Sequence, residues 1–355
     1  MIIQSNIHNY EVKFEADFAF FDALKAQPNA VFVCDAQIAA LYPSLLSGVA
    51  SHRVMLIEAI EENKTLDKVQ GVYRFLTPFP EKKKMHLISI GGGIIQDITG
   101  FVAQTLYRGV PWSFLPTTFL AQADSCVGSK TSLNFESYKN ILGGFYPPNT
   151  IYMCPAFLDS LSDRDYYSGI GEVIKFLLLD DLQAPDIQAI EKLAKALYDR
   201  RNRIEAIRSS LAVKQRFIAE DEFDLGKRNL FNYGHCFGHA LEATSHYAVP
   251  HGLAVVVGMM VANAVALGRG LISDEFFTDV NKRLFLPTLP ITFQADHFGA
   301  EAIVECLKND KKRVGKDLTM IIPSSDTIEA IKADDVTPLE VDNAIATVLP
   351  LLRVS

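Results

Sequence analysis

The sequence predicts two domains: an α/β nucleotide-binding domain with a parallel sheet at residues 1–160, then a mostly α-helical metal-binding domain at residues 161–355. Short apolar runs alternate with helical periodicities in the first half of the chain, whereas long helical periodicities dominate from about residue 165. At 355 residues, the chain is also long enough for two domains of ordinary size.

Four apolar runs in the first domain are typical of strands, at residues 30–34, 54–57, 85–90 and 112–115. Between them, the periodicity predicts helices at 36–48, 64–77 and 94–107. Alternation of this kind predicts parallel strands with helices on the faces of the sheet. Ligands of such sheets bind beyond the carboxyl ends of the strands. In this chain Asp35, a triple glycine and the pair Thr117 and Thr118 follow three of the four runs.

The second domain is expected to contain helices at 165–180, 186–199, 203–221, 230–245 and 252–269. Between the two patterns lies a segment at 116–140 that is rich in hydroxyl, amide and charged side chains. Because such residues rarely build a core, we expect a turn-rich segment that lines a pocket for anions and polyols.

Composition narrows the classes of function. The formal net charge of −8 argues against DNA or RNA as the main partner. No basic, apolar leader and no membrane span are expected from the sequence. Five scattered cysteines without a CxxC pair make a disulfide framework or a cysteine-rich zinc site improbable. A cytoplasmic protein is therefore expected.

Gly91, Gly92 and Gly93 follow the third strand and precede a helix expected to begin near Ile94. Glycines let the backbone approach a phosphate, and a helix N-terminus supplies N–H donors. The spacing is not GxGxxG, so a tight turn without a ligand is the alternative. Asp35 is a candidate acceptor for a ribose hydroxyl, with a helix cap as its alternative.

His235 and His239 are four residues apart and therefore share one helix face. His251 begins the next helix, and Glu172 lies on a separate one. Imidazole and carboxylate both suit Zn²⁺, so the set is a candidate metal site, with a structural histidine pair as the alternative. Lys175 either belongs to this site or forms a surface ion pair with Glu172. Other basic residues gain interest only if they converge on an anion: Lys214, Lys227, Arg228, Lys311 and Lys312.

Five motifs, in chain order, resemble those of 3-dehydroquinate synthase and the wider sugar-phosphate cyclase family. They are Gly91-Gly-Gly-Ile-Ile-Gln-Asp97, Arg108-Gly-Val-Pro111, Pro116-Thr-Thr-Phe-Leu-Ala-Gln-Ala-Asp-Ser125, Gly171-Glu-Val-Ile-Lys175 and Asn232-Tyr-Gly-His-Cys-Phe-Gly-His239. The resemblance extends from about Asp35 to Lys312, and the ordered set of motifs is highly specific.

The resemblance implies three sets of binding residues. NAD would be bound by Asp35, Glu61, Lys64, Gly92, Gly93, Asp97, Thr117, Thr118 and Lys139. A divalent metal, usually zinc with cobalt as an alternative, would be bound by Glu172, His235 and His251. Catalytic roles fall to Lys130, Lys175, Lys214, Arg228, Asn232 and His239. Further substrate contacts fall to Arg108, Asp124, Asn140 and one of Lys311 and Lys312. A homodimer is also implied, because the family residue that matches Arg108 can reach across a dimer interface.

The family chemistry is a closed redox cycle. NAD⁺ oxidises a ring carbinol, phosphate is eliminated, the hydride is returned, and an intramolecular aldol step closes a carbocycle. The default substrate implied is 3-deoxy-arabino-heptulosonate 7-phosphate.

This sequence departs from the family pattern in places. Gly128-Ser-Lys-Thr-Ser-Leu-Asn134 replaces Gly-Gly-Lys-Thr-Gly-Val-Asn, and His251-Gly-Leu253 replaces His-Gly-Glu. These changes do not alter the expected reaction type, but they do not fix the identity of the substrate. A related cyclase that acts on another sugar phosphate is therefore one alternative to a 3-dehydroquinate synthase. A metal- and NAD-dependent alcohol or glycerol dehydrogenase is a second, which the cluster of lysines disfavours, and a non-catalytic binding relative is a third.

Overall fold

The structure, a computed structural model, describes the whole chain except residues 137, 181–185, 309–317 and 328. It contains two compact units. The first comprises Met1–Leu161 and Ile218–Phe223, and the second comprises Ser162–Phe217 and Asp224–Ser355. The sequence predicts one boundary after residue 160, whereas the short segment Ile218–Phe223 returns to the first unit.

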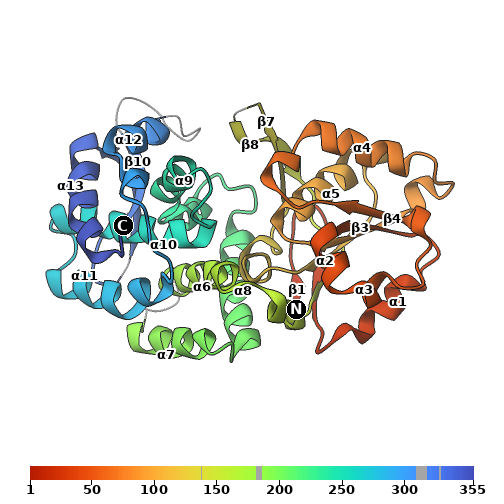
Figure 1. Ribbon diagram of the computed structural model, residues 1–355, viewed down its shortest axis with the longest axis horizontal. Helices are drawn as coiled ribbons and strands as arrows, with labels where there is room; N and C mark the ends of the chain where they lie inside the picture. Colours follow the sequence, from red (N-terminus) through yellow and green to blue (C-terminus); the bar gives the residue numbers. More distant parts are fainter. Residues whose placement is uncertain (137, 181–185, 309–317, 328) are drawn as a thin grey trace. The chain divides into compact units, whose positions relative to one another are not determined.

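A seven-stranded sheet forms the centre of the first unit, in the order β1-β2-β9-β6-β5-β3-β4 (Figure 1). Its strands are β1 (Ile2–Ile3), β2 (Tyr10–Phe14), β3 (Ala30–Asp35), β4 (Val54–Ile57), β5 (His86–Gly91), β6 (Trp112–Pro116) and β9 (Thr150–Met153). β1 is antiparallel to β2, and the other neighbours in the sheet are parallel. The predicted parallel α/β domain is therefore confirmed.

Helices cover both faces of this sheet (Figure 1). Phe32, Ile88 and Leu115 pack into one core with Phe21 and Ile38, which come from α1 (Phe21–Lys25) and α2 (Ala36–Leu41). Because side chains alternate along a strand, their neighbours point to the opposite face. There the sheet is covered by α5 (Gly93–Thr105), which contacts β3, β5, β6 and α4 (Leu66–Leu76).

The strand order reverses between β3 and β5. The chain continues from β3 to β4 at one edge of the sheet, but from β5 towards β6 on the other side. Cys34 pairs with Ile90, and Gly91 pairs with Pro116. Asp35, Gly91 and Pro116 therefore end their strands at the same edge. A reversal of this kind leaves a crevice beyond the strand ends in which ligands bind.

The segment at 116–140 is more regular than the sequence suggests. A π-helical turn at Ala121–Ser125 leads into a hairpin of β7 (Lys130–Phe135) and β8 (Tyr138–Phe145). The expectation of a turn-rich segment was wrong for this hairpin. Thr131 and Leu133 are buried while their neighbours are more exposed, so the alternation typical of a strand is present but carried partly by polar residues.

Two predicted helices are interrupted. The helix expected at 36–48 breaks at Tyr42, because Pro43 begins a separate helix, α3 (Pro43–Leu46). The helix expected at 230–245 begins only at His235. A 3-10 turn at Lys227–Asn232 precedes it, and Gly234 has a φ of 77°, which favours glycine and prevents a continuous helix.

The second unit is mostly helical, as predicted. Its helices are α6 (Asp163–Leu178), α7 (Ile187–Tyr198), α8 (Arg203–Glu220, whose end belongs to the first unit), α9 (His235–Thr244), α10 (His251–Gly268), α11 (Asp274–Val280), α12 (Ala300–Lys308) and α13 (Pro338–Val348). A two-stranded antiparallel sheet, β10 (Leu318–Pro323) and β11 (Ala330–Val336), completes it.

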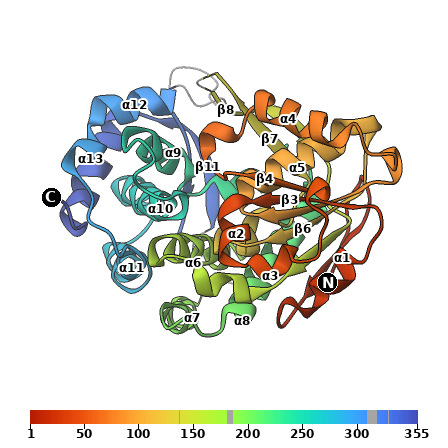
Figure 2. The same ribbon diagram turned by 45° about the vertical axis from the view of Figure 1, so that its right-hand side comes forward.

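Helix α10 is the core of the second unit and contacts α6, α9 and α13 (Figures 1 and 2). All of its residues from Gly252 to Ala266 are buried. The helix is long and apolar enough to cross a membrane by composition, but 83% of it is buried inside the protein, as is typical of a core helix.

Glycines let the backbones of α6 and α9 approach α10 closely. A Cβ added at Gly252 would lie 1.9 Å from the Ser168 carbonyl oxygen of α6, and one at Gly258 would lie 1.9 Å from the Gly234 carbonyl oxygen. Side chains at these two positions would force the helices apart. Gly252 directly follows His251, so this close packing also sets the position of a candidate metal ligand.

Candidate functional site

Three ligand atoms converge in the second unit. Glu172 lies on α6, His235 begins α9 and His251 begins α10. Glu172 Oε1 is 3.6 Å from His235 Nε2 and 3.7 Å from His251 Nε2. All three atoms lie within 4.8 Å of one another. The predicted set is therefore brought together from three helices.

The opposite nitrogen of each imidazole is held by an acceptor. His235 Nδ1 is 3.2 Å from the Tyr233 carbonyl oxygen, and His251 Nδ1 is 3.0 Å from Glu242 Oε2. A carbonyl or carboxylate oxygen can only accept, so both Nδ1 atoms carry the proton. In the neutral rings, both Nε2 lone pairs then face Glu172. This arrangement is typical of metal-ligating histidines.

The three atoms fit a divalent cation. Glu172 is fully buried, and its Oε1 has no hydrogen-bond partner among the described residues. Zinc bonds to nitrogen and oxygen are about 2.0–2.1 Å long, so neighbouring ligands of a tetrahedral ion lie about 3.3 Å apart. The observed 3.6 and 3.7 Å are close to this value. The lone pairs of these three atoms face one another with no hydrogen-bond donor between them, which is unfavourable in a buried position. A bound cation would stabilise the arrangement.

The surroundings shift the two histidines in opposite directions. Burial, reinforced by the charge of Lys175, lowers the pKa of His235 well below its usual value and keeps the ring neutral. Burial also acts to lower the pKa of His251, but Glu242 and Glu172 outweigh it and raise the pKa. A proton on His251 Nε2 would compete with a metal for the same lone pair.

A cationic region adjoins this set. Lys175 forms an ion pair with Glu172 Oε2 on α6, and both side chains are buried. The alternative of a surface ion pair was therefore wrong, because the spacing in sequence does not reveal burial. Lys175 and Lys214 lie over the ring of Phe176, with Nζ 4.6 and 5.9 Å from its centroid. Arg228, in the 3-10 turn before α9, is also buried.

A second group, His239, Glu242 and His251, also has ligand atoms within 4.8 Å. Its His251 Nδ1 already has Glu242 as its hydrogen-bond acceptor. His239 is exposed, and its ring centroid lies 5.5 Å from that of His235, which confirms that both share a face of α9. The first group is thus the better metal site.

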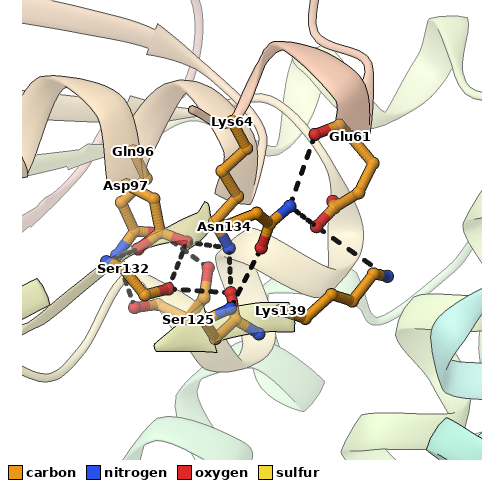
Figure 3. A network of polar contacts seen from close by, with 9 residues as sticks. Glu61, Lys64, Gln96, Asp97, Ser125, Ser132, Asn134 and Lys139 are labelled. Carbon is orange, nitrogen blue, oxygen red and sulfur yellow. Dashed lines mark hydrogen bonds and ion pairs between the residues drawn. The ribbon is translucent and has the colours of Figure 1, made fainter. Parts of the chain in front are cut away.

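In the first unit, four residues assigned to NAD by resemblance lie in one polar network (Figure 3). Lys64 Nζ forms an ion pair with Asp97 Oδ2 at 2.6 Å, and both side chains are largely buried. Burial raises the pKa of Asp97, although Lys64 opposes the shift. Glu61 Oε1 accepts a hydrogen bond from Asn134 and lies 3.8 Å from Lys139 Nζ.

The remaining NAD candidates lie at the carboxyl ends of the parallel strands. Asp35 caps α2 through Gln37 N, so the residue forms the expected helix cap, and its role in binding NAD stays a prediction. Burial raises the pKa of Asp35. Gly92 caps α5 and approaches the next strand end so closely that a Cβ would lie 3.0 Å from Thr118 Cγ2. The buried Thr117 Oγ1 has no hydrogen-bond partner within the described part of the chain, so an unsatisfied hydroxyl lies at this edge of the sheet.

The other predicted residues are more dispersed. Arg108 is exposed and has a φ of 64°, and Lys130 is exposed at the start of β7. Asp124 is half-buried in the π-helical turn, and Asn232 donates to the Asn229 carbonyl oxygen. Lys311 and Lys312 lie outside the described residues.

Three residues of these sites were missed from the sequence. Glu242 follows His239 by three residues and therefore shares its helix face, a signal that could have been used. Ser132 and Asn134 bond to Asp97 and Glu61, respectively. Their positions become apparent only once the hairpin is placed beside α5.

Comparisons with known proteins identify the family. The 3-dehydroquinate synthase N-terminal model matches residues 54–168, and the corresponding C-terminal model matches residues 169–313. A 3-dehydroquinate synthase from Streptococcus pyogenes serotype M5 is 30% identical over 343 residues, covering 94% of this chain and 95% of that protein. One from Clostridium tetani is 32% identical over 294 residues, covering 81% and 78%, respectively.

Solved structures show the same fold. The 2-epi-5-epi-valiolone synthase of Streptomyces hygroscopicus subsp. jinggangensis, with NAD⁺ and Zn²⁺ bound, has a TM-score of 0.84 at 24% identity and covers 96% of this chain and 97% of its own. A 2-deoxy-scyllo-inosose synthase complexed with carbaglucose-6-phosphate, NAD⁺ and Co²⁺ has a TM-score of 0.81 at 22% identity, with 97% and 98% covered. A probable glycerol dehydrogenase from Sinorhizobium meliloti is less similar, with a TM-score of 0.60 at 12% identity and 96% of both chains covered. The family models and the curated relatives together show that this chain belongs to the 3-dehydroquinate synthase family.

Proposed function

We propose that this protein is a 3-dehydroquinate synthase that requires NAD and a divalent metal ion, preferably Zn²⁺, with Co²⁺ as a substitute. It would convert 3-deoxy-arabino-heptulosonate 7-phosphate to a carbocycle and release phosphate. The observation that carries the proposal is the burial of Lys175, Lys214 and Arg228, which are 1%, 5% and 7% exposed. They lie in the same unit as the triad of candidate metal ligands, Glu172, His235 and His251. Charge-assisted contacts from these three side chains would suit a substrate with anionic groups.

Each set of residues has a role in that reaction. Glu172, His235 and His251 would hold the metal ion, and the residues assigned to NAD would hold the cofactor. When bound, NAD supplies reversible hydride transfer, and the metal ion polarises the oxygen of the carbinol that is oxidised.

The chain's own side chains bind and orient the substrate. Lys175, Lys214 and Arg228 would bind its carboxylate and hydroxyl oxygens through charge-assisted hydrogen bonds. Lys130, Arg108, Asp124, Asn140 and Asn232 would complete the contacts, together with one lysine from outside the described residues. His239 is exposed beside the triad and suited to move a proton near neutral pH.

The relatives support the acid as substrate, since the curated proteins matched over most of their length are 3-dehydroquinate synthases. A related cyclase for another sugar phosphate is the second candidate. Serines at positions 129 and 132 replace glycines of the family motif and favour it, because they alter the surroundings of Lys130 and Asn140.

We also propose a cytoplasmic homodimer. All five cysteines lie within the described residues and carry free thiols, which suits a reducing compartment. Arg108 is exposed, as a residue that reaches towards a partner subunit must be. Analytical ultracentrifugation should show one species of twice the chain mass, and a monomer at working concentration would contradict this.

The test is a phosphate-release assay with parallel absorbance at the NADH band. The zinc- and NAD-loaded protein is given the heptulosonate phosphate, a seven-carbon ketose phosphate without a carboxylate, and glucose 6-phosphate. We expect phosphate from the acid alone, a carbocyclic product by NMR and no net NADH. Stoichiometric NADH would identify a dehydrogenase, and phosphate released only from a sugar phosphate without a carboxylate would identify a different cyclase.

Arg228→Ala separates anion binding from cofactor binding. Loss of a charge-assisted contact should raise KM for the acid by about tenfold or more while leaving the Kd of NAD within about twofold. Arg201→Ala is the matched control, because Arg201 is largely exposed and pairs with Asp199. Equal losses of affinity for acid and NAD would contradict the assigned role.

A further inference from the structure

Ser132 closes a ring of contacts at the polar network of the first unit (Figure 3). Lys64 Nζ lies 2.6 Å from both Asp97 Oδ2 and Asn140 Oδ1. Ser132 Oγ lies 3.1 Å from the same Asp97 oxygen and 3.0 Å from the same Asn140 oxygen. Two oxygens on different elements are thus each held by the ammonium group and by the hydroxyl group.

The ammonium group fixes the orientation of the Asn140 amide. A lysine only donates, so the oxygen of the amide, and not its NH₂ group, must face Lys64 Nζ. The NH₂ group of Asn140 is then turned away from the ion pair. The side chain therefore presents a donor, which suits a phosphate or hydroxyl oxygen of a substrate.

The backbone of Asn140 is held by contacts of its own. Its φ is 56°, in the left-handed region, which asparagine adopts more readily than most residues other than glycine. Its N–H donates to Asn134 Oδ1 at 3.0 Å, and Asn134 in turn donates to Glu61. Asn140 is exposed, so these contacts and those of its side chain, more than burial, restrict its rotation.

Ser132 contributes through its hydroxyl separately from its backbone. Its N–H donates to Asp97 Oδ1 at 3.0 Å, so the strand stays attached to α5 without the side chain. The single hydroxyl proton is shared between two acceptors, one on Asp97 and one on Asn140. Removing the hydroxyl would leave Asn140 Oδ1 with Lys64 as its remaining donor in this ring.

We propose that Ser132 is a positioning residue that holds the Asn140 amide ready to bind the phosphorylated substrate, and so sets substrate affinity without contacting NAD. This rests on the proposed function, which assigns Asn140 to the substrate and the Lys64–Asp97 pair to the cofactor. The hydroxyl limits the rotamers of Asn140, which lowers the entropy lost when the substrate binds.

The test is isothermal titration calorimetry on the zinc-loaded chain, first with NAD and then with the phosphonate analogue of the heptulosonate phosphate. Ser132→Ala should weaken binding of the phosphonate by about three- to tenfold and change the Kd of NAD by less than about twofold. Ser132→Thr keeps the hydroxyl and should restore the phosphonate affinity. Ser125→Ala is the matched control, because it removes a hydroxyl-to-amide bond of the same network, to Gln96 Oε1, that does not reach Asn140.

A second comparison separates positioning from general loosening of the network. In an Asn140→Ala background, Ser132→Ala should have no further effect on phosphonate binding, because the residue through which it acts is gone. An unchanged Kd in Ser132→Ala, the same loss in both backgrounds, or an equal loss of NAD affinity would each overturn the inference. Failure of the unsubstituted protein to bind the phosphonate would instead reject the proposed function on which the inference rests.

Discussion

Substitution of Glu242 tests the metal site through a residue that does not bind the metal. Glu242 Oε2 accepts a hydrogen bond from His251 Nδ1 at 3.0 Å and has a side chain that is 13% exposed. A hydrogen bond to a charged group contributes about 1.5–3 kcal/mol. Loss of such a partner typically lowers metal affinity by about 10–100-fold, or about 1.4–2.8 kcal/mol. The two ranges agree, so we expect Zn²⁺ affinity to fall by about tenfold in Glu242→Gln and by up to about a hundredfold in Glu242→Ala.

The assay is competition for Zn²⁺ between the metal-free protein and a fluorescent chelator at pH 8, the same for every variant. Glu242→Gln keeps an oxygen acceptor, so its loss should be the smaller of the two. Glu301→Gln, an exposed site on α12, is the matched control, and circular dichroism checks that each variant is folded. Zinc affinity unchanged in both Glu242 variants would refute the argument that this carboxylate fixes the tautomer and orientation of His251.

Two further predictions concern stability. Gly252→Ala should lower the free energy of unfolding, measured in urea, by about 1–3 kcal/mol, because its Cβ would lie 1.9 Å from the Ser168 carbonyl oxygen. Gly268→Ala on the same helix should leave it unchanged, because no atom of the described residues lies within 4 Å of the added Cβ. Equal losses in both variants would contradict the close-packing argument. The Arg269 ion pair lowers the pKa of Glu340 from 4.5 to about 2, so its stabilisation is complete above the unfolded pKa and is lost as the pH falls from about 4.5 to 2. The partly exposed pair should contribute about 1 kcal/mol, and a Glu340→Gln variant with the same pH dependence of unfolding as the natural protein would count against it.

The sequence predicted the buried parts of the fold well. The run 30–34 is apolar throughout, and 85–90 is mostly apolar, because both faces of a central parallel strand are covered. Strand β2, which lies between β1 and β9, was missed although Tyr10–Phe14 alternates apolar and charged residues, because it is short and lies outside the strand–helix alternation. The hairpin at 130–145 was missed because half of its pattern consists of polar residues.

The residues of the candidate metal site were predicted from the sequence, but the burial and the hydrogen-bond partners of the surrounding side chains were not. The spacing of His235 and His239 places them on one helix face, and residue chemistry adds Glu172 and His251 as candidate ligands. Motif resemblance then selects Glu172, His235 and His251 as the ligand set. Neither indicates that Lys175 is buried, since burial depends on how closely α6 and α10 pack at Gly252. Neither reveals Glu242 as the acceptor for His251, or Ser132 as a bridge between Asp97 and Asn140, because such contacts depend on side-chain geometry.

The convergence of Glu172, His235 and His251 on one cation is the central claim and can be measured directly. Crystals of the zinc-loaded protein, recorded on both sides of the zinc absorption edge, give an anomalous difference map that locates the ion. We expect one strong peak per chain, about 2.0–2.2 Å from Glu172 Oε1 and from both Nε2 atoms, and its loss in His235→Ala. A peak at His239 and Glu242 instead, or no peak at the triad in fully loaded protein, would contradict the account.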